Sequence, residues 1–562
     1  QKEGLAPDTI SFICVLKACA KIGAIEKGKQ IHKEIKDRGL LGKDTNLGAS
    51  LVDMYAKCGI LEKTRAVLEE LPIRDTVSWN AIISGYADQG QGYEALNCFK
   101  HMQEEGISPN SVTFICVLKA CSATQNLELG EEICAEAQKQ GLLVKDPVLG
   151  TALVDMYAKC GMLDKAQGVF DLLQVRDVVC WTALITGYAL HGHGIEALKL
   201  LRQMRKEHVS PNVVTFICIL KACSSIGSLG MGETIHAEVA KKGLLRKNIV
   251  LGTALVDMYV KCGVLIKAQE VFHMLPRRDV VSWNVLLAGY TQHGLNEEVL
   301  EYFKEMQDEG ISPSAVTFMC ILRSCSSLGS LEVGEEIHKR AEKRGLLEKS
   351  IALGNTLVDM YAKCGELKKA QNVFDKLIVK DVVSWTALMT GYAQLGQAKM
   401  VLDIFNKMMR EGIEPDSIAF FVVLSACSHT CLVHKCYTYL EDMSKQYGIT
   451  PNFEHYTCMI DLFGRAGHFD KAVTIINEMP SLDYSPVWGS LMNACQKWGN
   501  VNLARLAFEH AICLDKSTCT AYICMTNIYI AAGMQDDAQI IEVMRAENAQ
   551  CVNPTRAPKR KT

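Results

Sequence analysis

The stretch LVDMYAKCG at residues 51–59 recurs as LVDMYAKCG at 153–161, as LVDMYVKCG at 255–263 and as LVDMYAKCG at 357–365. Each copy begins 102 residues after the previous one. A tryptophan has the same period, at Trp79, Trp181, Trp283 and Trp385. A fixed internal period of this kind indicates stacked structural units, each of which buries its apolar face against its neighbours.

The period divides into three kinds of unit. The landmark TFICVLKAC at 113–121 returns as TFICILKAC at 215–223, and cutting the chain at such landmarks gives units of 36, 31 and 35 residues in a fixed order. Four triplets then fill residues 9–416, and residues 1–8 look like the end of an earlier unit. The units are 9–44, 45–75, 76–110, 111–146, 147–177, 178–212, 213–248, 249–279, 280–314, 315–350, 351–381 and 382–416.

Each unit has the pattern of two helices. In 147–177, Leu153, Met156 and Tyr157 share one helical face, Gly161 ends that helix, and a second apolar stripe follows. No segment shows sustained alternation of apolar and polar residues, so no strand is expected. The sequence therefore predicts an all-α fold, an α-solenoid of two-helix repeats.

The cysteine of the repeated stretch is predicted to be a packing residue. Equivalent cysteines lie three units apart, whereas the ligands of one metal ion converge within about 4–5 Å. A chain of 562 residues with 24 cysteines and no secretory signal is expected to keep its thiols reduced. The four cysteines are Cys58, Cys160, Cys262 and Cys364.

Composition limits the possible functions. No run of eighteen apolar residues occurs, so a membrane-spanning helix is not expected. The net charge of −3 and the isoelectric point of about 6.6 count against a strongly basic nucleic-acid-binding domain. The chain opens QKEGLAPDTI, without a Met and partway through a repeat, so we expect any targeting segment to lie outside this sequence.

Two longer segments show a resemblance to a known family. DVVSWNVLLAGYTQHGLNEEVLEYFKEMQDEGISPS at 279–314 and LGTALVDMYAKCGMLDKAQGVFDLL at 149–173 resemble pentatricopeptide repeats of the plant P-L-S subclass. Tetratricopeptide repeats fit less well, because they have a constant 34-residue period with the Trp elsewhere. The resemblance implies a right-handed superhelix in which the 36-, 31- and 35-residue units are L, S and P motifs. It also implies last L and S motifs at 417–484, extension motifs at 485–517 and 518–552, and a basic tail at 553–562.

What the resemblance implies about function is sequence-specific binding of single-stranded RNA in mitochondria or chloroplasts, with mitochondria favoured. Members of this subclass serve as site-recognition factors for C-to-U editing. No C-x-x-C pair of a zinc deaminase is present, so the chain is expected to be no enzyme, to hold no metal or other cofactor, and to act with a deaminase-domain protein in trans. The second extension motif loses its usual ending after Arg545. Two alternatives stay open: an RNA-binding factor for transcript stability, splicing or translation, and a protein-binding scaffold.

Two short motifs could be mistaken for catalytic or metal sites. HAE at 236–238 has the H-x-E form but no Cys pair after it, and we expect a solvated helix face there. CSHTCLVHKC at 427–436 has a spacing that fits no standard zinc finger, and it is ordinary for the family's last L motif. Its candidate ligands are Cys427, His429, Cys431, His434 and Cys436.

In this family the fifth and last residues of a unit read one base. Asp in last position accepts from the imino N–H of guanine or uracil, and Asn or Ser donates to the bare ring nitrogen of adenine or cytosine. Short Thr in fifth position admits a purine, and Asn reaches a pyrimidine. The seven pairs are Asn80 with Asn110, Thr151 with Asp177, Thr182 with Asn212, Thr253 with Asp279, Asn284 with Ser314, Asn355 with Asp381, and Thr386 with Asp416.

From 5′ to 3′ these pairs predict Y-N-G-A-N-G-C-N-U-G, where Y is a pyrimidine and N is any base. The N positions belong to units with Ile115, Ile217 or Met319 in fifth position, which are expected to be spacers. Ala49 with Asp75 is only half coded, and Tyr484 replaces a polar reader. Second-position valines are expected to sandwich the bases: Val77, Val179, Val281 and Val383. The alternative role of the Asn, Thr and Asp side chains is helix capping.

Overall fold

The computed structural model describes residues 7–41, 44–142, 146–515 and 519–552. Within them it contains 33 helices and no strand, which confirms the all-α prediction. The chain divides into two compact units, Gln1–Gly289 and Tyr290–Thr562. The expected basic tail at 553–562 and most of the expected motif end at 1–8 lie outside the described residues.

The helices pair into hairpins, and the first helix of each hairpin begins at the first residue of an expected repeat, except that α33 begins at Cys519, one residue after 518. The first helices are α1 (Thr9–Ile22), α3 (Thr45–Lys57), α5 (Thr76–Asp88), α7 (Ser111–Thr124), α10 (Pro147–Lys159), α12 (Val178–Leu190), α14 (Val213–Ile226), α16 (Ile249–Lys261), α18 (Val280–Gln292), α20 (Ala315–Leu328), α23 (Ile351–Lys363), α25 (Val382–Gln394), α27 (Ser417–His429), α29 (Phe453–Ala466), α31 (Ser485–Trp498) and α33 (Cys519–Ala531).

The second helices complete the hairpins. They are α2 (Ile25–Asp37), α4 (Leu61–Glu70), α6 (Gly92–Glu104), α8 (Leu127–Lys139), α11 (Leu163–Leu172), α13 (Gly194–Lys206), α15 (Leu229–Lys241), α17 (Leu265–His273), α19 (Asn296–Asp308), α21 (Leu331–Lys343), α24 (Leu367–Lys376), α26 (Ala398–Arg410), α28 (Val433–Lys445), α30 (Phe469–Glu478), α32 (Val501–Leu514) and α34 (Gln535–Val552). A short helix, α22 (Leu346–Lys349), lies between α21 and α23.

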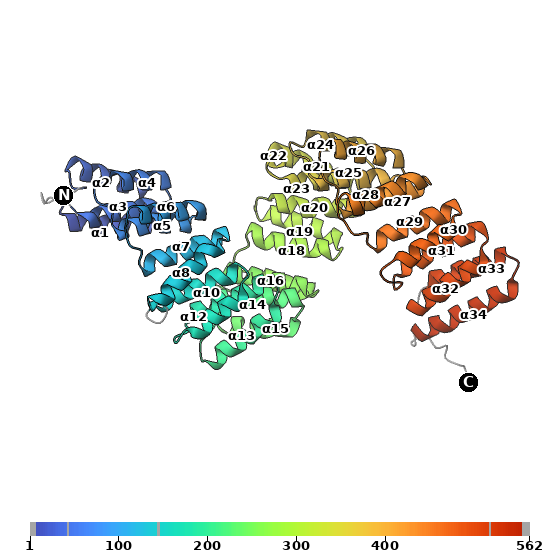
Figure 1. Cartoon of the computed structure of the whole chain (residues 1–562), viewed down its shortest axis with the longest axis horizontal. Coiled ribbons are helices and arrows are strands. Elements are labelled where there is room, and N and C mark those ends of the chain that lie inside the picture. The colour runs from blue at the N-terminus through green and yellow to red at the C-terminus, as the bar shows by residue number, and fades with distance from the viewer. Residues whose placement is uncertain (1–6, 42–43, 143–145, 516–518, 553–562) are drawn as a thin grey trace. The chain divides into compact units, whose positions relative to one another are not determined.

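Within each compact unit the hairpins stack in chain order. First helices pack side by side, as α1, α3 and α5 do at the blue end of Figure 1. In most hairpins the second helix packs against its own first helix and the following one, as α4 does with α3 and α5. The first helices therefore form one layer and the second helices another, which is the solenoid arrangement expected from the repeats. None of the described helices is long and apolar enough to cross a membrane.

The hairpin of residues 147–177 shows why the sequence folds this way. The carboxylate of Asp146 accepts from the backbone N–H groups of Val148 and Leu149 and so caps α10. Gly161 takes a φ of 79° directly after the helix, a conformation that glycine adopts without strain. At Gly150 a Cβ would lie 2.4 Å from Cδ2 of Leu173, the residue directly after α11, so this side chain packs onto the backbone of α10 at a position without a Cβ.

The four repeated cysteines lie at the C-caps of α3, α10, α16 and α23, beside the helix-ending glycines. They are half-buried, which is less covered than the packing prediction implied. Partial burial raises the pKa of each thiol, so these groups stay neutral and lack the thiolate character of nucleophiles. Sγ of Cys160 contacts Sδ of Met156 at 4.0 Å.

Candidate functional site

The last residue of each unit caps the first helix of the next unit. Asn110 Oδ1 accepts from the backbone N–H of Thr113 at 3.0 Å, and Asp381 Oδ1 accepts from that of Ser384 at 2.8 Å. The same bond is made by every other last-position residue of the seven predicted pairs: Asp177, Asn212, Asp279, Ser314 and Asp416. The capping role is therefore real at all seven positions.

Capping leaves the second polar atom of the Asn and Asp side chains available. In each Asn and Asp the cap takes Oδ1, which is the group that the two residue types share. Within the described part of the chain, no hydrogen bond is made by the second oxygen of Asp177, Asp279, Asp381 or Asp416, or by Nδ2 of Asn110 or Asn212. What remains is an acceptor on Asp and a donor on Asn, which is the difference that base reading needs.

Asparagines in fifth position bond directly to the last residue of their own unit. Asn80 Nδ2 donates to Asn110 Oδ1 at 3.1 Å, and Asn355 Nδ2 donates to Asp381 Oδ1 at 3.0 Å. The Ser384 hydroxyl donates to Asn355 Oδ1 at 2.7 Å. In two of the predicted pairs, Asn80 with Asn110 and Asn355 with Asp381, the two side chains are thus hydrogen-bonded to each other, although they lie 30 and 26 residues apart in the chain.

Two of the four threonines in fifth position, Thr182 and Thr386, turn their hydroxyls toward the protein. Oγ1 of Thr182 donates to Val178 O at 2.6 Å and lies 2.7 Å from Oγ1 of Thr215, which in turn bonds Asn212. Oγ1 of Thr386 likewise donates to the backbone of its own helix. Such a Thr offers no free hydroxyl to a ligand, but its short side chain leaves space beside it. This agrees with the expectation that Thr makes room for a purine.

The fifth residues are more buried than reading residues were expected to be. Asn355 is 7% exposed, and four others have 7–9% exposure: Asn80, Thr182, Thr253 and Thr386. Thr151 and Asn284 are half-buried. A side chain this covered offers little more than its outer edge to a ligand. The last residues are less covered, since Asn110 and Asp177 are exposed and the other five are half-buried.

Electrostatics keep Asp381 ionised. Burial by itself favours the neutral acid, but hydrogen bonds from Ser384 and Asn355 outweigh it, so the pKa of Asp381 lies below its ordinary value of 3.8. At neutral pH this carboxylate is therefore an acceptor only.

Two grooves bring predicted site residues together. One has a volume of about 600 Å³, and its lining includes Thr151, Val179, Thr182 and Asn212. The other has a volume of about 420 Å³, and its lining includes Asn355, Asp381, Val383, Thr386 and Asp416. We name them the first groove and the second groove.

The two grooves are the same site repeated. Ile115, Lys119 and Asp155 of the first groove correspond to Met319, Arg323 and Asp359 of the second, each 204 residues later, which is two periods. Each groove lies within one compact unit of the chain. Because the same positions are hollowed out in both units, the groove is a property of the repeat and not of one local irregularity.

A row of exposed apolar side chains, longer than the four predicted valines, lies at the starts of the first helices. The predicted valines Val77, Val179, Val281 and Val383 are 53–57% exposed. Second-position residues of seven other units are apolar and exposed in the same way: Ile10, Val112, Val148, Val214, Val250, Val316 and Ile418. Val148 and Val214 line the first groove and Ile418 lines the second. The signal was available, since every one of these is the second residue of its unit.

The remaining predicted positions lie outside the two grooves. Thr253 lies on α16 and Asp279 caps α18, but no hydrogen bond joins the two side chains. Asn284 and Ser314 belong to different compact units. Tyr484 stacks on Phe453 with ring centroids 5.2 Å apart and does not cap its helix through its side chain, so it departs from the last-position pattern.

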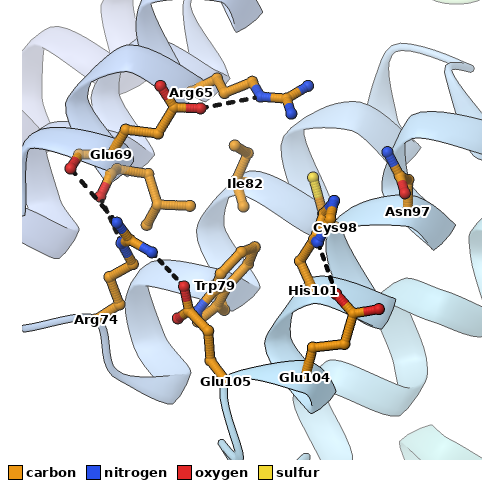
Figure 2. Close-up of a pocket in the computed structure, with 11 residues that line it drawn as sticks. Arg65, Glu69, Arg74, Trp79, Ile82, Asn97, Cys98, His101, Glu104 and Glu105 are labelled. Atoms are coloured by element: carbon orange, nitrogen blue, oxygen red, sulfur yellow. Dashed lines mark hydrogen bonds and ion pairs between the residues drawn. The ribbon is translucent and has the colours of Figure 1, made fainter.

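A further pocket of about 310 Å³ lies between α4, α5 and α6, away from the predicted readers (Figure 2). Arg74 bonds the Glu105 carboxylate, which also accepts from Trp79 Nε1 at 3.2 Å. His101 and Glu104 form another pair at 3.0 Å. The charged side chains of this pocket are paired with one another. The Arg74–Glu105 pair links successive hairpins, so the contacts in the pocket are structural.

The two decoy motifs have structural roles. His236 is half-buried and its Nδ1 lies 2.9 Å from the Tyr259 hydroxyl, so the expectation of a solvated face at 236–238 was wrong for this residue. Cys436 is buried, with Sγ 3.0 Å from Sδ of Met459. Among the residues that the structure describes, no three His, Cys, Asp or Glu side chains are grouped so as to hold a metal ion.

Comparison with known proteins gives a consistent family. The family model "PPR repeat family" matches residues 74–123, 176–225, 278–327 and 380–429. Models described as "PPR repeat" match residues 10–40, 151–178, 253–280, 355–382 and 447–480.

Similar proteins come from Arabidopsis thaliana. Pentatricopeptide repeat-containing protein At4g33990 is 34% identical over 532 residues, which cover 94% of this chain and 63% of that protein. Pentatricopeptide repeat-containing protein At1g15510, chloroplastic, is 34% identical over 98% of this chain and 63% of that protein. Pentatricopeptide repeat-containing protein At2g03380, mitochondrial, is 33% identical over 96% of this chain and 78% of that protein. The chain thus spans less than two thirds of the length of the first two.

Among solved structures, the pentatricopeptide repeat protein PPR10 in complex with an 18-nt psaJ RNA element is similar, with a TM-score of 0.61 and 17% identity over 97% of this chain and 85% of that one. At this identity the likeness concerns the fold. The repeat matches and the curated relatives, taken with the hairpin stack described above, show that this chain belongs to the pentatricopeptide repeat family.

Proposed function

We propose that this chain binds single-stranded RNA in a sequence-specific manner and acts as a site-recognition factor for C-to-U editing of organellar transcripts. The observation that carries the binding proposal is the polar group that the last-position Asn and Asp residues keep free after capping. An Asp that caps through Oδ1 keeps an acceptor, and an Asn that caps through Oδ1 keeps a donor, so one backbone geometry presents either chemistry to a base edge.

The grooves support the same proposal. They combine exposed second-position side chains, which offer apolar contact to the faces of bases, with polar groups at the fifth and last positions. Single-stranded RNA is recognised by base edges and stacking, and a strongly basic surface is not required for it. The net charge of −3 is therefore compatible with this function. A similar fold has been solved with an RNA element bound.

The expected target, read from the amino to the carboxyl end as 5′ to 3′, is Y-N-G-A-N-G-C-N-U-G. The repeats of 36, 31 and 35 residues act as L, S and P motifs, and 485–552 as extension motifs that engage a deaminase-domain protein. This chain supplies recognition, and the deaminase supplies the zinc chemistry. Names of the similar proteins include both chloroplastic and mitochondrial ones, which supports an organellar site of action.

The test is a selection from randomised single-stranded RNA with the purified chain, followed by deamination assays. We expect enrichment of the stated sequence, no cytidine deamination by the chain alone, and editing once a deaminase-domain protein is added. Enrichment without any editing in the presence of such proteins would favour a role in transcript stability, splicing or translation. A chain that enriches no sequence would be a protein-binding scaffold.

A further inference from the structure

The ninth residues of the units form a row beside the fifth residues. On a helix, residues four apart lie on the same face one turn, about 5.4 Å, along the axis. Both grooves contain this row: Lys119, Asp155 and Thr186 line the first groove, and Arg323, Asp359 and Thr390 line the second. A strand whose bases face the fifth and last residues would run its sugar-phosphate backbone next to this row.

Charge in the row depends on the kind of unit. The 36-residue units carry a cation in ninth position, namely Lys17, Lys119, Lys221 and Arg323. The 31-residue units carry an aspartate, and each aspartate pairs with the lysine four residues later, as Asp155 does with Lys159 at 2.7 Å and Asp359 with Lys363 at 2.9 Å. The acidic members of the row are therefore already neutralised.

The cations differ in whether a carboxylate neutralises them. Lys119 pairs with Asp88, which lies 31 residues before it. The residues 31 before Lys221 and Arg323 are Leu190 and Gln292, neither of which is acidic. Both cations are exposed, and neither forms an ion pair with any residue that the structure describes.

The lining of the second groove is acidic, so RNA phosphates need a cation beside it. This lining carries Asp359, which Lys363 neutralises, and the carboxylates of Asp381 and Asp416, and Arg323 is the one basic residue among the side chains that line the groove. A polyanion that brings its bases to Asp381 and Asp416 is repelled by them unless a positive group lies beside its phosphates. A guanidinium suits this role because its planar set of donors matches two phosphate oxygens.

We infer that Lys221 and Arg323 bind RNA phosphates opposite the unread nucleotides, so that the 36-residue units act as phosphate clamps and not as spacers. This inference rests on the proposed RNA binding and assigns a role to the units that offer no polar group to a base. In the expected target, Lys221 lies at the fifth nucleotide and Arg323 at the eighth. Lys119 makes a weaker clamp at the second, because Asp88 competes for it.

The test measures the affinity of 5′-CUGAUGCUUG-3′ for the full chain between 50 and 200 mM KCl by fluorescence anisotropy. The variants are Lys221→Gln, Arg323→Gln and the double variant. For single strands each phosphate contact contributes about 0.7 to the slope of log affinity against log salt, so each single variant should lower the slope by about 0.7 and the double variant by about 1.4. Over this salt range each cation then accounts for about a two- to threefold change in affinity.

Lys368→Gln is the matched control, because Lys368 is exposed on α24, lines neither groove and carries the same charge. It should leave the slope unchanged. A second measurement uses RNA with one uncharged methylphosphonate linkage at the eighth nucleotide. This linkage should weaken binding to the wild-type chain about as much as Arg323→Gln does, and it should add little to that variant.

The outcomes separate the clamp from the proposed function. If the wild-type chain binds the RNA with the expected base preference but both single variants keep its slope, the clamp is overturned and the base reading stands. The clamp is also overturned if Lys368→Gln lowers the slope as much as Arg323→Gln. If the wild-type chain does not bind this RNA at any salt concentration, the proposed function fails and the clamp fails with it.

Discussion

The amide of Asn355 donates a hydrogen bond of 3.0 Å to Oδ1 of Asp381, the same oxygen that caps α25. The fifth and last residues of this unit are thus hydrogen-bonded to each other. The Asn355 amide orients the Asp381 carboxylate, whose second oxygen stays free. A change at either residue is therefore expected to act on the same base.

Asp381→Asn is the sharpest test of this arrangement. The substitution keeps the Oδ1 that caps α25 and exchanges the free acceptor for an amide donor. Preference at the ninth nucleotide should move from U to C, with a discrimination on the order of 1–3 kcal/mol if base readout in duplexes is a fair guide. Selection from RNA randomised at that position measures it.

The control for that selection is Met319→Ala, a change of fifth residue in an unread unit, which should leave the preference at every position unchanged. Unaltered preference for U in Asp381→Asn would show that this side chain caps the helix and reads nothing.

Asn355→Thr tests the other member of the pair. The shorter side chain makes room for a purine while Asp381 still accepts from an imino N–H, so preference at the ninth nucleotide should move from U towards G. The amide that holds Oδ1 is lost as well, and overall affinity is expected to fall about tenfold, equivalent to one hydrogen bond of about 1.4 kcal/mol. A shift of the preference towards C instead would contradict the hypothesis that the size of the fifth residue selects between purine and pyrimidine.

Ser384→Ala probes how the Asn355–Asp381 pair is held together. The Ser384 hydroxyl lies 2.7 Å from Asn355 Oδ1 and 2.8 Å from Asp381 Oδ1, and its removal leaves a buried Asn oxygen without that donor. We expect a loss of about 1–3 kcal/mol in the free energy of unfolding, measured by urea denaturation, with the base preference kept. The equivalent residue after Asp416 is Ala419, so Ala419→Ser is the reciprocal variant and should not destabilise the chain.

The sequence predicted the hairpins well because their ends are marked locally. Asp146 before α10 and Gly161 after it are capping residues whose effect does not depend on the rest of the fold. Stacking followed from the period, since a single hairpin cannot bury its apolar face. The capping role of the last-position residues was also foreseen as an alternative, and the structure shows that it coexists with a free polar group.

What the sequence could not show depends on contacts between units. The deep burial of Asn355 results from the packing of α23 against α25, and no local pattern distinguishes a covered fifth residue from an exposed one. His236 was expected on a solvated helix face because no Cys pair follows the H-x-E motif, and that observation says nothing about burial. Its partner, Tyr259, lies 23 residues away on the next first helix.

Three such His–Tyr pairs predict a pH dependence of stability. Nδ1 lies 2.9–3.1 Å from the Tyr hydroxyl in each pair, and the histidines are His32, His236 and His338. Burial lowers the pKa of each of them below the ordinary value of 6.5. Because the folded chain binds these protons less readily than the unfolded chain, the free energy of unfolding should fall as the pH drops through 6.5 and level off below the folded-state pKa values.

Cys134→His supplies a matched variant, because Cys134 holds the corresponding place beside Tyr157. The new hydrogen bond should raise the free energy of unfolding at pH 7.5, measured by urea denaturation, by about 0.5–1.5 kcal/mol. It should also steepen the loss of stability between pH 6.5 and 5. Tyr259→Phe removes one hydroxyl and should lower stability at pH 7.5. A midpoint that is independent of pH over this range in all variants would show that the histidines do not titrate with unfolding.

Removal of one whole period tests whether stability resides in contacts between neighbours. Deletion of 111–212 joins Asn110 to Val213, so Asn110 can cap α14 through Thr215 just as Asn212 does in the full chain. Since the faces that meet are equivalent, the shortened chain should fold with the same helicity per residue by circular dichroism. Deletion of 111–161 removes a hairpin and only half of the next, which leaves α11 without its first helix. If this second deletion kept as much helicity per residue as the first, the boundaries of the repeats would be misplaced.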